Sequence, residues 1–487
     1  MPSLRLIAMA LFVAVACPIS VRRPFYGLIA LVAMYYFRPD VWDAPGWFRP
    51  QLFLTLAVGI GWLVNLKAFR WDALMSLAAF VIVGFMSTSF LAEDDAGVAF
   101  DGAVILTKLA IVMLFTLNLV DTPARMNVFL WANVLGFVYN LKSVYVTGLT
   151  GNDVNVRVDV GVGQGGGANY IAMICAIAFA ICFVRFQEGS RKERLWAAAM
   201  IGAYLLALVL TGSRAGILAI AAVGAYFLGR SILGGSKKAV GGVVTLGVLG
   251  LLFFAVIPAE HLARFRGITQ SQSNASSGSG LDIGSSAATR DNSAQSRIDL
   301  WVNGAIPMFL QRPISGVGMD NYQLASPRYV GFYASKNYAP YVPGVKGRGF
   351  VAHSTWFQTL AEGGLLMAIP FFAMIFLAFG KLAAVRRIKS ADPRIALLKS
   401  QATQATGILI AFCVASTFGS HIKIDFYWWY MGAIGSISLM GRRIVQADAS
   451  RRLEAARTAA IAARESRLAA QASDASSRTS PAPVGAH

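Results

Sequence analysis

Charged residues are scarce in this chain. Only 14% of its 487 residues are Asp, Glu, Lys or Arg, whereas 56% are hydrophobic. A soluble domain carries charge on about a quarter of its residues, so this composition excludes an ordinary soluble globular fold. Cysteine is rarer still: all four cysteines lie in apolar stretches. That placement is typical of small core residues, and it predicts neither a disulfide framework nor a metal site.

Acidic residues are also few: the chain has 24 Asp and Glu residues against 43 Lys and Arg residues, which gives a formal net charge of +19. Such an excess can indicate binding to nucleic acid. Here, however, much of the positive charge lies in short loops that alternate with apolar blocks, which is the pattern of a membrane protein. We therefore expect a lipid bilayer as the partner of this chain, and no nucleic acid.

The apolar residues are grouped into blocks long enough to cross a bilayer as helices of about 20 residues. The first block, 4–20, has no small-x-small cleavage site before Arg22 and Arg23, so we interpret it as a retained span. The predicted spans are 4–20, 24–37, 51–66, 72–92, 103–120, 126–147, 168–186, 195–211, 214–229, 239–258, 356–380, 401–419 and 424–441. The sequence thus predicts an all-α polytopic membrane protein with about 12 to 13 transmembrane helices.

Lys and Arg in the connecting loops predict the orientation. They accumulate in the loops at 185–194, 230–238 and 381–399, which we expect to be cytoplasmic. The loops at 93–102 and 148–167 are acidic or nearly neutral and are expected to be periplasmic. The C-terminus is then cytoplasmic, and the long loop 259–355 is periplasmic.

This reading divides the chain into four parts. Residues 1–258 form an N-terminal transmembrane bundle and residues 259–355 a periplasmic loop; residues 356–441 form the C-terminal transmembrane helices. Within the loop we expect a flexible Ser/Gly-rich insert at 269–296 and an amphipathic helix at 297–311. Residues 442–487 form a basic cytoplasmic tail, partly helical and partly disordered.

The sharpest candidate for chemistry is Arg214, which stands at the predicted periplasmic boundary of two apolar blocks. A snorkelling arginine or a loop cation is one explanation. The other is a guanidinium that binds phosphate, because its planar donors suit bidentate binding and its charge survives burial. His353, one of only four histidines, lies where the polar loop enters a span. It is either a general base for a hydroxyl or a satisfied structural residue. His421 and Lys423, near the start of the last span, are secondary candidates.

Two glycine-rich stretches, GVGQGGGANY (161–170) and GVGMDNY (316–322), invite a phosphate-binding interpretation. No strand precedes the first, so it lacks the context of a dinucleotide-binding or P-loop site. Both are either turns or places where backbone amides approach a ligand. No paired carboxylates indicate a glycosidase, and no spacing of residues indicates a metal site.

Several short segments follow one another in a particular order: RVDVGVGQGGGANY (157–170), TGSRAG (211–216), RIDLW (297–301), RPISGVGMDNY (312–322) and HSTWFQTLAEGGLL (353–366). Taken in this order, they resemble the O-antigen ligase and O-antigen polymerase superfamily. The N-terminal RRPFYGLIALVAMYYFRPDVW (22–42) is similar to the start of exosortase-associated putative O-glycosylation ligases, a branch of the same superfamily. The resemblance implies a C-type glycosyltransferase architecture, with many membrane helices and a periplasmic lid.

The resemblance also implies an activity at the periplasmic face of the bacterial inner membrane. Such proteins move a glycan from an undecaprenyl-diphosphate carrier onto a hydroxyl, without metal or other cofactor. Carried over residue by residue, His353 would be the catalytic base. The diphosphate ligands would be Arg214, Arg297, Arg312 and Arg157, with Arg290 as a substitute for Arg297 and Asn169 as a further candidate.

Three acceptors remain open: lipid A core glycolipid, another carrier-linked glycan, as in a polymerase, or a protein Ser/Thr hydroxyl, as in an O-oligosaccharyltransferase. A polysaccharide transporter or flippase is the alternative from another class. It would require charges along a path through the bilayer, for which only Lys108 and Lys142 are suitable.

Overall fold

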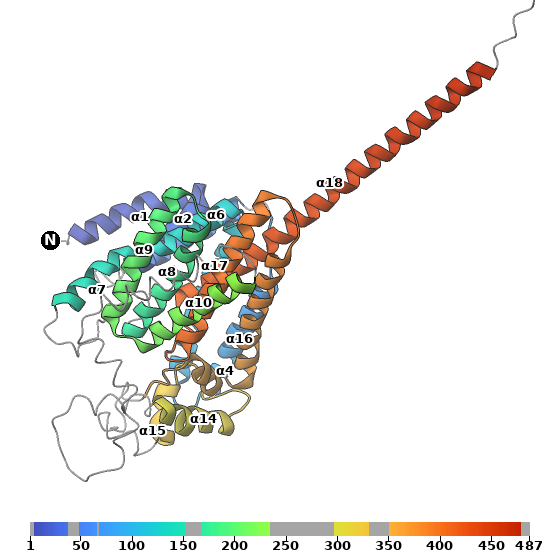
Figure 1. Ribbon diagram of the computed structural model, residues 1–487. Helices are drawn as coiled ribbons and strands as arrows, with labels where there is room; N and C mark the ends of the chain where they lie inside the picture. Colours follow the sequence, from blue (N-terminus) through green and yellow to red (C-terminus); the bar gives the residue numbers. More distant parts are fainter. Residues whose placement is uncertain are drawn as a thin grey trace, which may run out of the picture.

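The computed structural model describes residues 4–37, 48–65, 68–150, 167–233, 297–330 and 350–478. Within these ranges every regular element is a helix and no strand occurs, so the predicted all-α class is confirmed. The elements, in chain order (Figure 1), are α1 (Leu4–Arg22), α2 (Pro24–Phe37), α3 (Pro50–Val64), α4 (Ala73–Ser89), α5 (Ala96–Leu119), α6 (Pro123–Gly136), α7 (Val138–Thr150), α8 (Ala168–Glu188), α9 (Arg191–Thr211), α10 (Arg214–Leu233), η2 (Leu300–Ala305), α14 (Ile306–Gln311), α15 (Tyr322–Val330), α16 (Thr355–Arg387), α17 (Pro393–Ser416) and α18 (Asp425–Arg478).

Six of the described helices are long and apolar enough to cross a membrane: α5, α8, α9, α10, α16 and α17. Helices α1 to α4 are shorter apolar helices. The predicted span 239–258 and the insert 269–296 lie outside the described residues. The chain is therefore a multi-pass membrane protein.

One predicted span is wrong, because the stretch 126–147 forms two helices, α6 and α7, that are separated at Phe137. Packing accounts for the break. Gly136 lies so close to the Tyr36 ring that an added Cβ would come within 2.4 Å of it. The Phe137 ring is fully buried and stacks on Tyr204 with centroids 6.0 Å apart.

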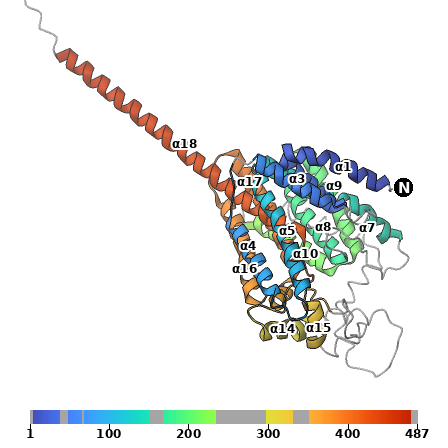
Figure 2. The same cartoon turned by 180° about the vertical axis from the view of Figure 1, so that it is seen from behind.

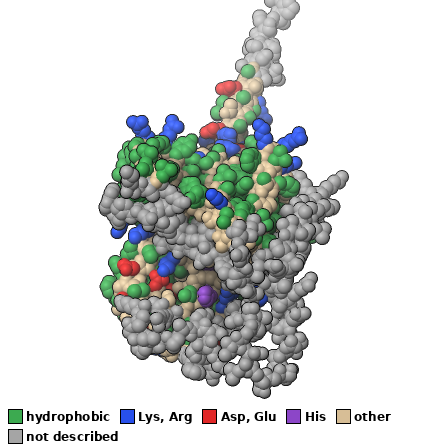
Figure 3. Space-filling model, turned by 90° about the vertical axis from the view of Figure 1, so that its left-hand side faces the viewer, with side chains coloured by type: hydrophobic (Ala, Val, Ile, Leu, Met, Phe, Trp, Pro, Cys, Tyr) green, Lys and Arg blue, Asp and Glu red, His purple; other side chains and the backbone are tan. Residues whose placement is uncertain are grey.

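Helix α8 is the centre of the bundle. It packs against α9, α10 and α17, and 89% of its most apolar stretch is buried. Large apolar side chains on the outer helices point outwards, such as Leu56 on α3, Phe80 on α4 and Phe376 on α16. Figure 3 shows one face of the bundle, on which hydrophobic side chains predominate and Lys and Arg side chains lie along the upper edge. A surface of this kind is stable against lipid chains and unfavourable in water.

The predicted last span and the tail as far as Arg478 form one continuous helix. Helix α18 is 54 residues long, and its side chains from 451 to 469 are all exposed. It leaves the bundle at the end opposite to α14 and α15, as both ribbon views show (Figures 1 and 2).

At the other end, residues 297–330 and 350–354 form a small helical layer that we refer to as the cap. A first helical turn leads into η2, a π-helix, and then into α14; a turn at 312–321 connects to α15. The cap packs on the end of α16 and on the loop between α4 and α5. A buried cluster joins it to α16 and includes Met308 and Tyr322 from the cap and Ala361 from α16.

Candidate functional site

The turn of the cap is attached to an interruption in α16. The backbone leaves the helical region at Gly364, where φ is 56° and ψ is −161°. Four backbone hydrogen bonds join the two segments: from Val317 N to Ala361 O (2.8 Å), Gly318 N to Glu362 O (3.0 Å), Leu365 N to Pro313 O (2.7 Å) and Leu366 N to Ile314 O (3.2 Å). This ladder fixes the cap on the start of α16.

The glycines of this contact are required by its closeness. A Cβ on Gly316 would lie 2.4 Å from the carbonyl carbon of Glu362, and one on Gly364 would lie 2.4 Å from the carbonyl oxygen of Ile314. Both glycines also have positive φ angles, of 64° and 56°, which other residues adopt at a cost. The glycine-rich stretch 316–322 is thus a docking element, in which the amides of Val317 and Gly318 are already bonded to α16.

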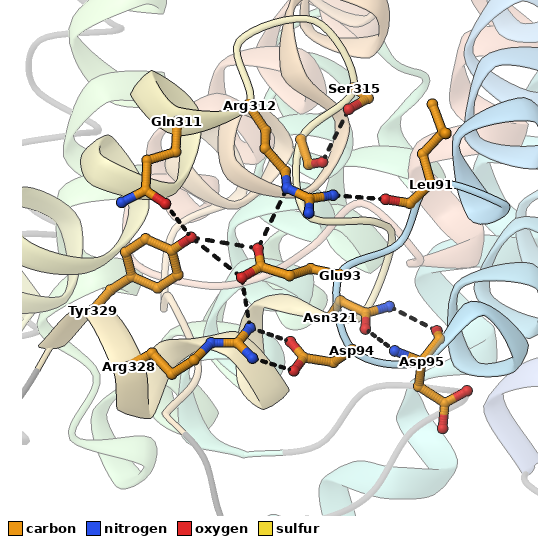
Figure 4. Close-up of polar contacts among 11 residues, drawn as sticks. Leu91, Glu93, Asp94, Asp95, Gln311, Arg312, Ser315, Asn321, Arg328 and Tyr329 are labelled. Atoms are coloured by element: carbon orange, nitrogen blue, oxygen red, sulfur yellow. Dashed lines mark hydrogen bonds and ion pairs between the residues drawn. The ribbon is translucent and has the colours of Figure 1, made fainter.

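A cluster of charged groups forms a second attachment, between the cap and the loop 90–95 (Figure 4). The Arg328 guanidinium donates to both carboxylate oxygens of Asp94, at 2.6 and 2.7 Å, and lies 2.8 Å from Glu93. Arg312 donates to the carbonyl of Leu91 at 2.8 Å and lies 3.7 Å from the Glu93 carboxylate. The predicted diphosphate ligand Arg312 therefore has protein partners in this structure.

Asn321 makes the third attachment and is fully buried. Its side-chain oxygen accepts from the amide of Asp95 at 2.8 Å, and its side-chain nitrogen donates to the carbonyl of the same residue at 3.0 Å. Figure 4 shows this pair of bonds beside the charged cluster. The cap is thus held by backbone, ionic and amide contacts.

His353 lies where the cap passes into α16. It is half-buried, and its backbone has a φ of 49°, in the left-handed region. The indole nitrogen of Trp301 donates to the carbonyl of Ala352 at 2.8 Å, and the Trp301 ring stacks on Phe357. Arg297 precedes Trp301 by one helical turn at the start of the described cap. The cap therefore brings Arg297 and His353 into one region.

The loop 417–424, between α17 and α18, supports the start of α16. The hydroxyl of Thr355 donates to the carbonyl of Gly419 at 2.8 Å and accepts from the amide of His421 at 2.8 Å. The imidazole of His421 is buried, and burial lowers its pKa from 6.5 to about 3. This histidine is therefore neutral at physiological pH and packs inside the loop.

The same loop reaches the start of α10. Ser213 caps this helix, because its hydroxyl oxygen accepts from the amide of Gly216 at 3.2 Å. The hydroxyl also donates to the side-chain oxygen of Asn169 at 2.8 Å, and the side-chain nitrogen of Asn169 donates to the carbonyl of Phe418 at 3.4 Å. Arg214, half-buried, is the first residue of α10. The loop 417–424 thus connects the segments that carry Arg214 and His353.

Between the cap, α5, α16 and this loop lies a cavity of about 410 Å³. Lys423 lies on its wall and is paired with both carboxylate oxygens of Asp320, at 2.6 and 2.7 Å. Glu362 and Gln358, from the start of α16, line the same cavity. The sequence indicated Lys423 as a secondary candidate but did not single out Asp320 or Glu362, which are far from it in the chain.

Two of the predicted ligands, Arg157 and Arg290, lie outside the described residues. Among the residues that the structure does describe, no group of three or more His, Cys, Asp or Glu side chains is arranged to hold a metal ion.

The fold defines a class: a multi-pass helical membrane protein with a small helical cap at one end of the bundle. Residues 199–372 match the model of a family described as O-antigen ligase. The match confirms the resemblance to the O-antigen ligase and polymerase superfamily, whose activity is glycosyl transfer. It includes Arg214, Arg297, His353 and Glu362. No curated protein matches the chain.

Proposed function

We propose that this protein transfers a glycan from an undecaprenyl-diphosphate carrier to an acceptor hydroxyl at the periplasmic face of the bacterial inner membrane. The observation that carries the proposal is the connection made by the loop 417–424. Through Phe418, Asn169 and Ser213 it reaches the start of α10, and through Thr355 it reaches the start of α16. This connection supports our assignment of Arg214 and His353 to one site, and both residues lie within the segment that matches the O-antigen ligase family.

Arg214 is our first diphosphate ligand. It stands at the N-terminal end of α10, where the helix dipole favours an anion. Arg297 is the second, since the contact of Trp301 with Ala352 holds its helical turn beside His353. The two guanidinium groups would stabilise the negative charge that develops on the leaving diphosphate. Arg157 and Arg290 are further candidates for this role, and Arg312, bonded to Leu91, is a weaker one.

His353 is the proposed base. It takes the proton from the acceptor hydroxyl, the oxygen attacks the anomeric carbon, and the bond from that carbon to the phosphate oxygen breaks with its electron pair leaving on the diphosphate. The acceptor is a lipid A core sugar, another carrier-linked glycan or a protein hydroxyl. His421 is buried with a pKa of about 3, so it is not our choice for the base.

The test is complementation of a strain from which the gene has been deleted, with surface glycan measured on gels and blots. We expect His353→Ala to reduce transfer by about 100-fold or more. Arg214→Lys is expected to be nearly as damaging as Arg214→Ala, because a lysine cannot bind phosphate bidentately. Arg457→Ala, on the exposed tail of α18, is the matched control and should be fully active.

All variants must be present in the membrane at equal amounts. Full glycan display with His353→Ala would refute the assignment of the base, and full activity of Arg214→Lys would refute bidentate binding. The glycan that disappears on deletion separates the acceptors. Loss of long-chain lipopolysaccharide indicates a ligase, arrest at one repeat indicates a polymerase, and loss of glycosylated protein indicates an oligosaccharyltransferase.

A further inference from the structure

The cavity beside Lys423 has the volume of a small-molecule binding site. Its volume of about 410 Å³ lies within the range of about 300–1,000 Å³ that is usual for small-molecule sites. The wall comes from four separate segments: the cap, the first turn of α5, the first turns of α16 and the loop 417–424. Such convergence of distant segments on one cavity is typical of a binding site.

The charge on the wall does not suit a diphosphate. Asp95, Asp320 and Glu362 face a single cation, Lys423, whose charge is matched by Asp320 at 2.6 Å. No arginine belongs to the described wall. Because its one cation is already paired, the described wall offers no unmatched positive charge to a diphosphate, whereas its polar side chains can exchange hydrogen bonds with neutral hydroxyl groups.

Unused hydrogen-bonding groups line the same wall. The side-chain oxygen of Gln358 and the hydroxyl of Ser420 are buried without a partner, and the Gln358 side chain is 8% exposed. Glu362 accepts from Gln358 at 3.1 Å and from the amide of Tyr322 at 3.3 Å, both through Oε1. Buried polar atoms without partners are costly and uncommon. Their placement around a cavity indicates a ligand with several hydroxyl groups.

The apolar part of the wall completes the description. Val98, Leu324, Val351 and Ile422 supply surfaces against which the C–H faces of a sugar ring can pack. Val351 and Ala352 precede His353 directly, so the cavity lies beside the proposed base. The loop 417–424 turns its Phe418 carbonyl toward Asn169 and the Arg214 side, while Ser420 and Lys423 face the cavity.

We propose that this cavity binds a neutral sugar of the acceptor and presents its hydroxyl to His353. The inference rests on the proposed function and narrows it, because it assigns the acceptor to carbohydrate and not to a protein Ser or Thr side chain.

The experiment uses the full-length protein in lipid nanodiscs and saturation-transfer difference NMR. The probes are the methyl glycosides of glucose, galactose and N-acetylglucosamine. We expect at least one probe to bind the wild type, with its signal reduced about fivefold or more in Val98→Trp, which fills the cavity, and in Gln358→Leu, which removes its polar atoms. Val83→Trp, on the outward-facing surface of α4 where Val83 is 61% exposed, is the control and should bind as the wild type does.

Each variant is first checked for a single size-exclusion peak and an unchanged melting temperature. If Val98→Trp does not fold, Gln358→Leu decides alone. The inference is overturned if none of the three probes gives a signal, or if both cavity variants bind them as the wild type does. The NMR experiment measures binding and does not require glycan transfer. If the protein binds the glycosides but supports no glycan display in cells, the proposed function is refuted and the binding site is not. Loss of binding with full glycan transfer would refute the acceptor site alone.

Discussion

Replacement of Gly364 by alanine should release the cap from α16. Gly364 has a φ of 56° and a ψ of −161°, a conformation that costs a residue with a side chain about 1–3 kcal/mol. The new Cβ would also lie 2.4 Å from the Ile314 oxygen and 2.8 Å from the Gly316 nitrogen. Both contacts are with backbone, so the cap must move.

That movement breaks the bonds that Leu365 and Leu366 donate to the cap, at 2.7 and 3.2 Å, each worth about 0.5–1.5 kcal/mol. The total is about 2–6 kcal/mol against the docked cap. Opening of the cap should therefore become at least about 30-fold more frequent.

Hydrogen–deuterium exchange of the full-length protein in nanodiscs measures this opening through the amides of Val317 and Gly318, which donate to α16. We expect both to exchange at least about 30-fold faster in Gly364→Ala. The matched control is Gly380→Ala in the same helix. Gly380 is exposed and a Cβ there meets no atom within 4 Å, so alanine should leave exchange unchanged and stabilise α16 slightly. Equal exchange in the two variants would show that the conformation of Gly364 does not hold the cap.

Two further predictions concern stability, measured as the unfolding free energy or melting temperature in detergent. Lys381→Met should lower the unfolding free energy by about 3–5 kcal/mol, because it leaves the Asp72 carboxylate buried without its partner at 2.7 Å. Combining Lys381→Met with Asp72→Asn should recover most of this loss. A double variant as unstable as the single one would contradict the explanation. Burial lowers the pKa of His421 to about 3 in the folded protein, against about 6.5 when unfolded, so its contribution is complete above pH 6.5 and is lost as the pH falls towards 3. Between pH 7 and pH 4 the unfolding free energy of the wild type should fall by about 3 kcal/mol more than that of His421→Gln. Equal losses would show that burial does not lower the pKa of this histidine.

The helices could be predicted from the sequence because lipid imposes a simple rule: apolar blocks of sufficient length become spans. The rule predicted α8, α9 and α10 closely. It failed at residues 126–147, because the break at Phe137 comes from packing against Tyr36 and Tyr204 and has no strong local signal.

The sequence indicated only some residues of the candidate site. Arg214 and His353 stood out because charge and histidine are rare at membrane boundaries, and the structure connects their segments through one loop. The cavity was missed because its ion pair joins Asp320 to Lys423, which are 103 residues apart. From the sequence, the amides of the stretch 316–322 could either meet a ligand or belong to a simple turn. In the structure the amides of Val317 and Gly318 bond to α16. This contact depends on the interruption of α16 at Gly364, which a single sequence does not reveal.

The continuity of α18 gives the cavity a mechanical connection to the far side of the membrane bundle. The helix begins at Asp425, two residues after Lys423, and its 54 residues extend for about 80 Å. A tilt of about 5° at its base would displace its tip by about 7 Å. The helix would therefore convert a small rearrangement of the loop 417–424 into a larger displacement near Arg478. A fluorophore at that position could report the displacement by energy transfer, without any label near the site.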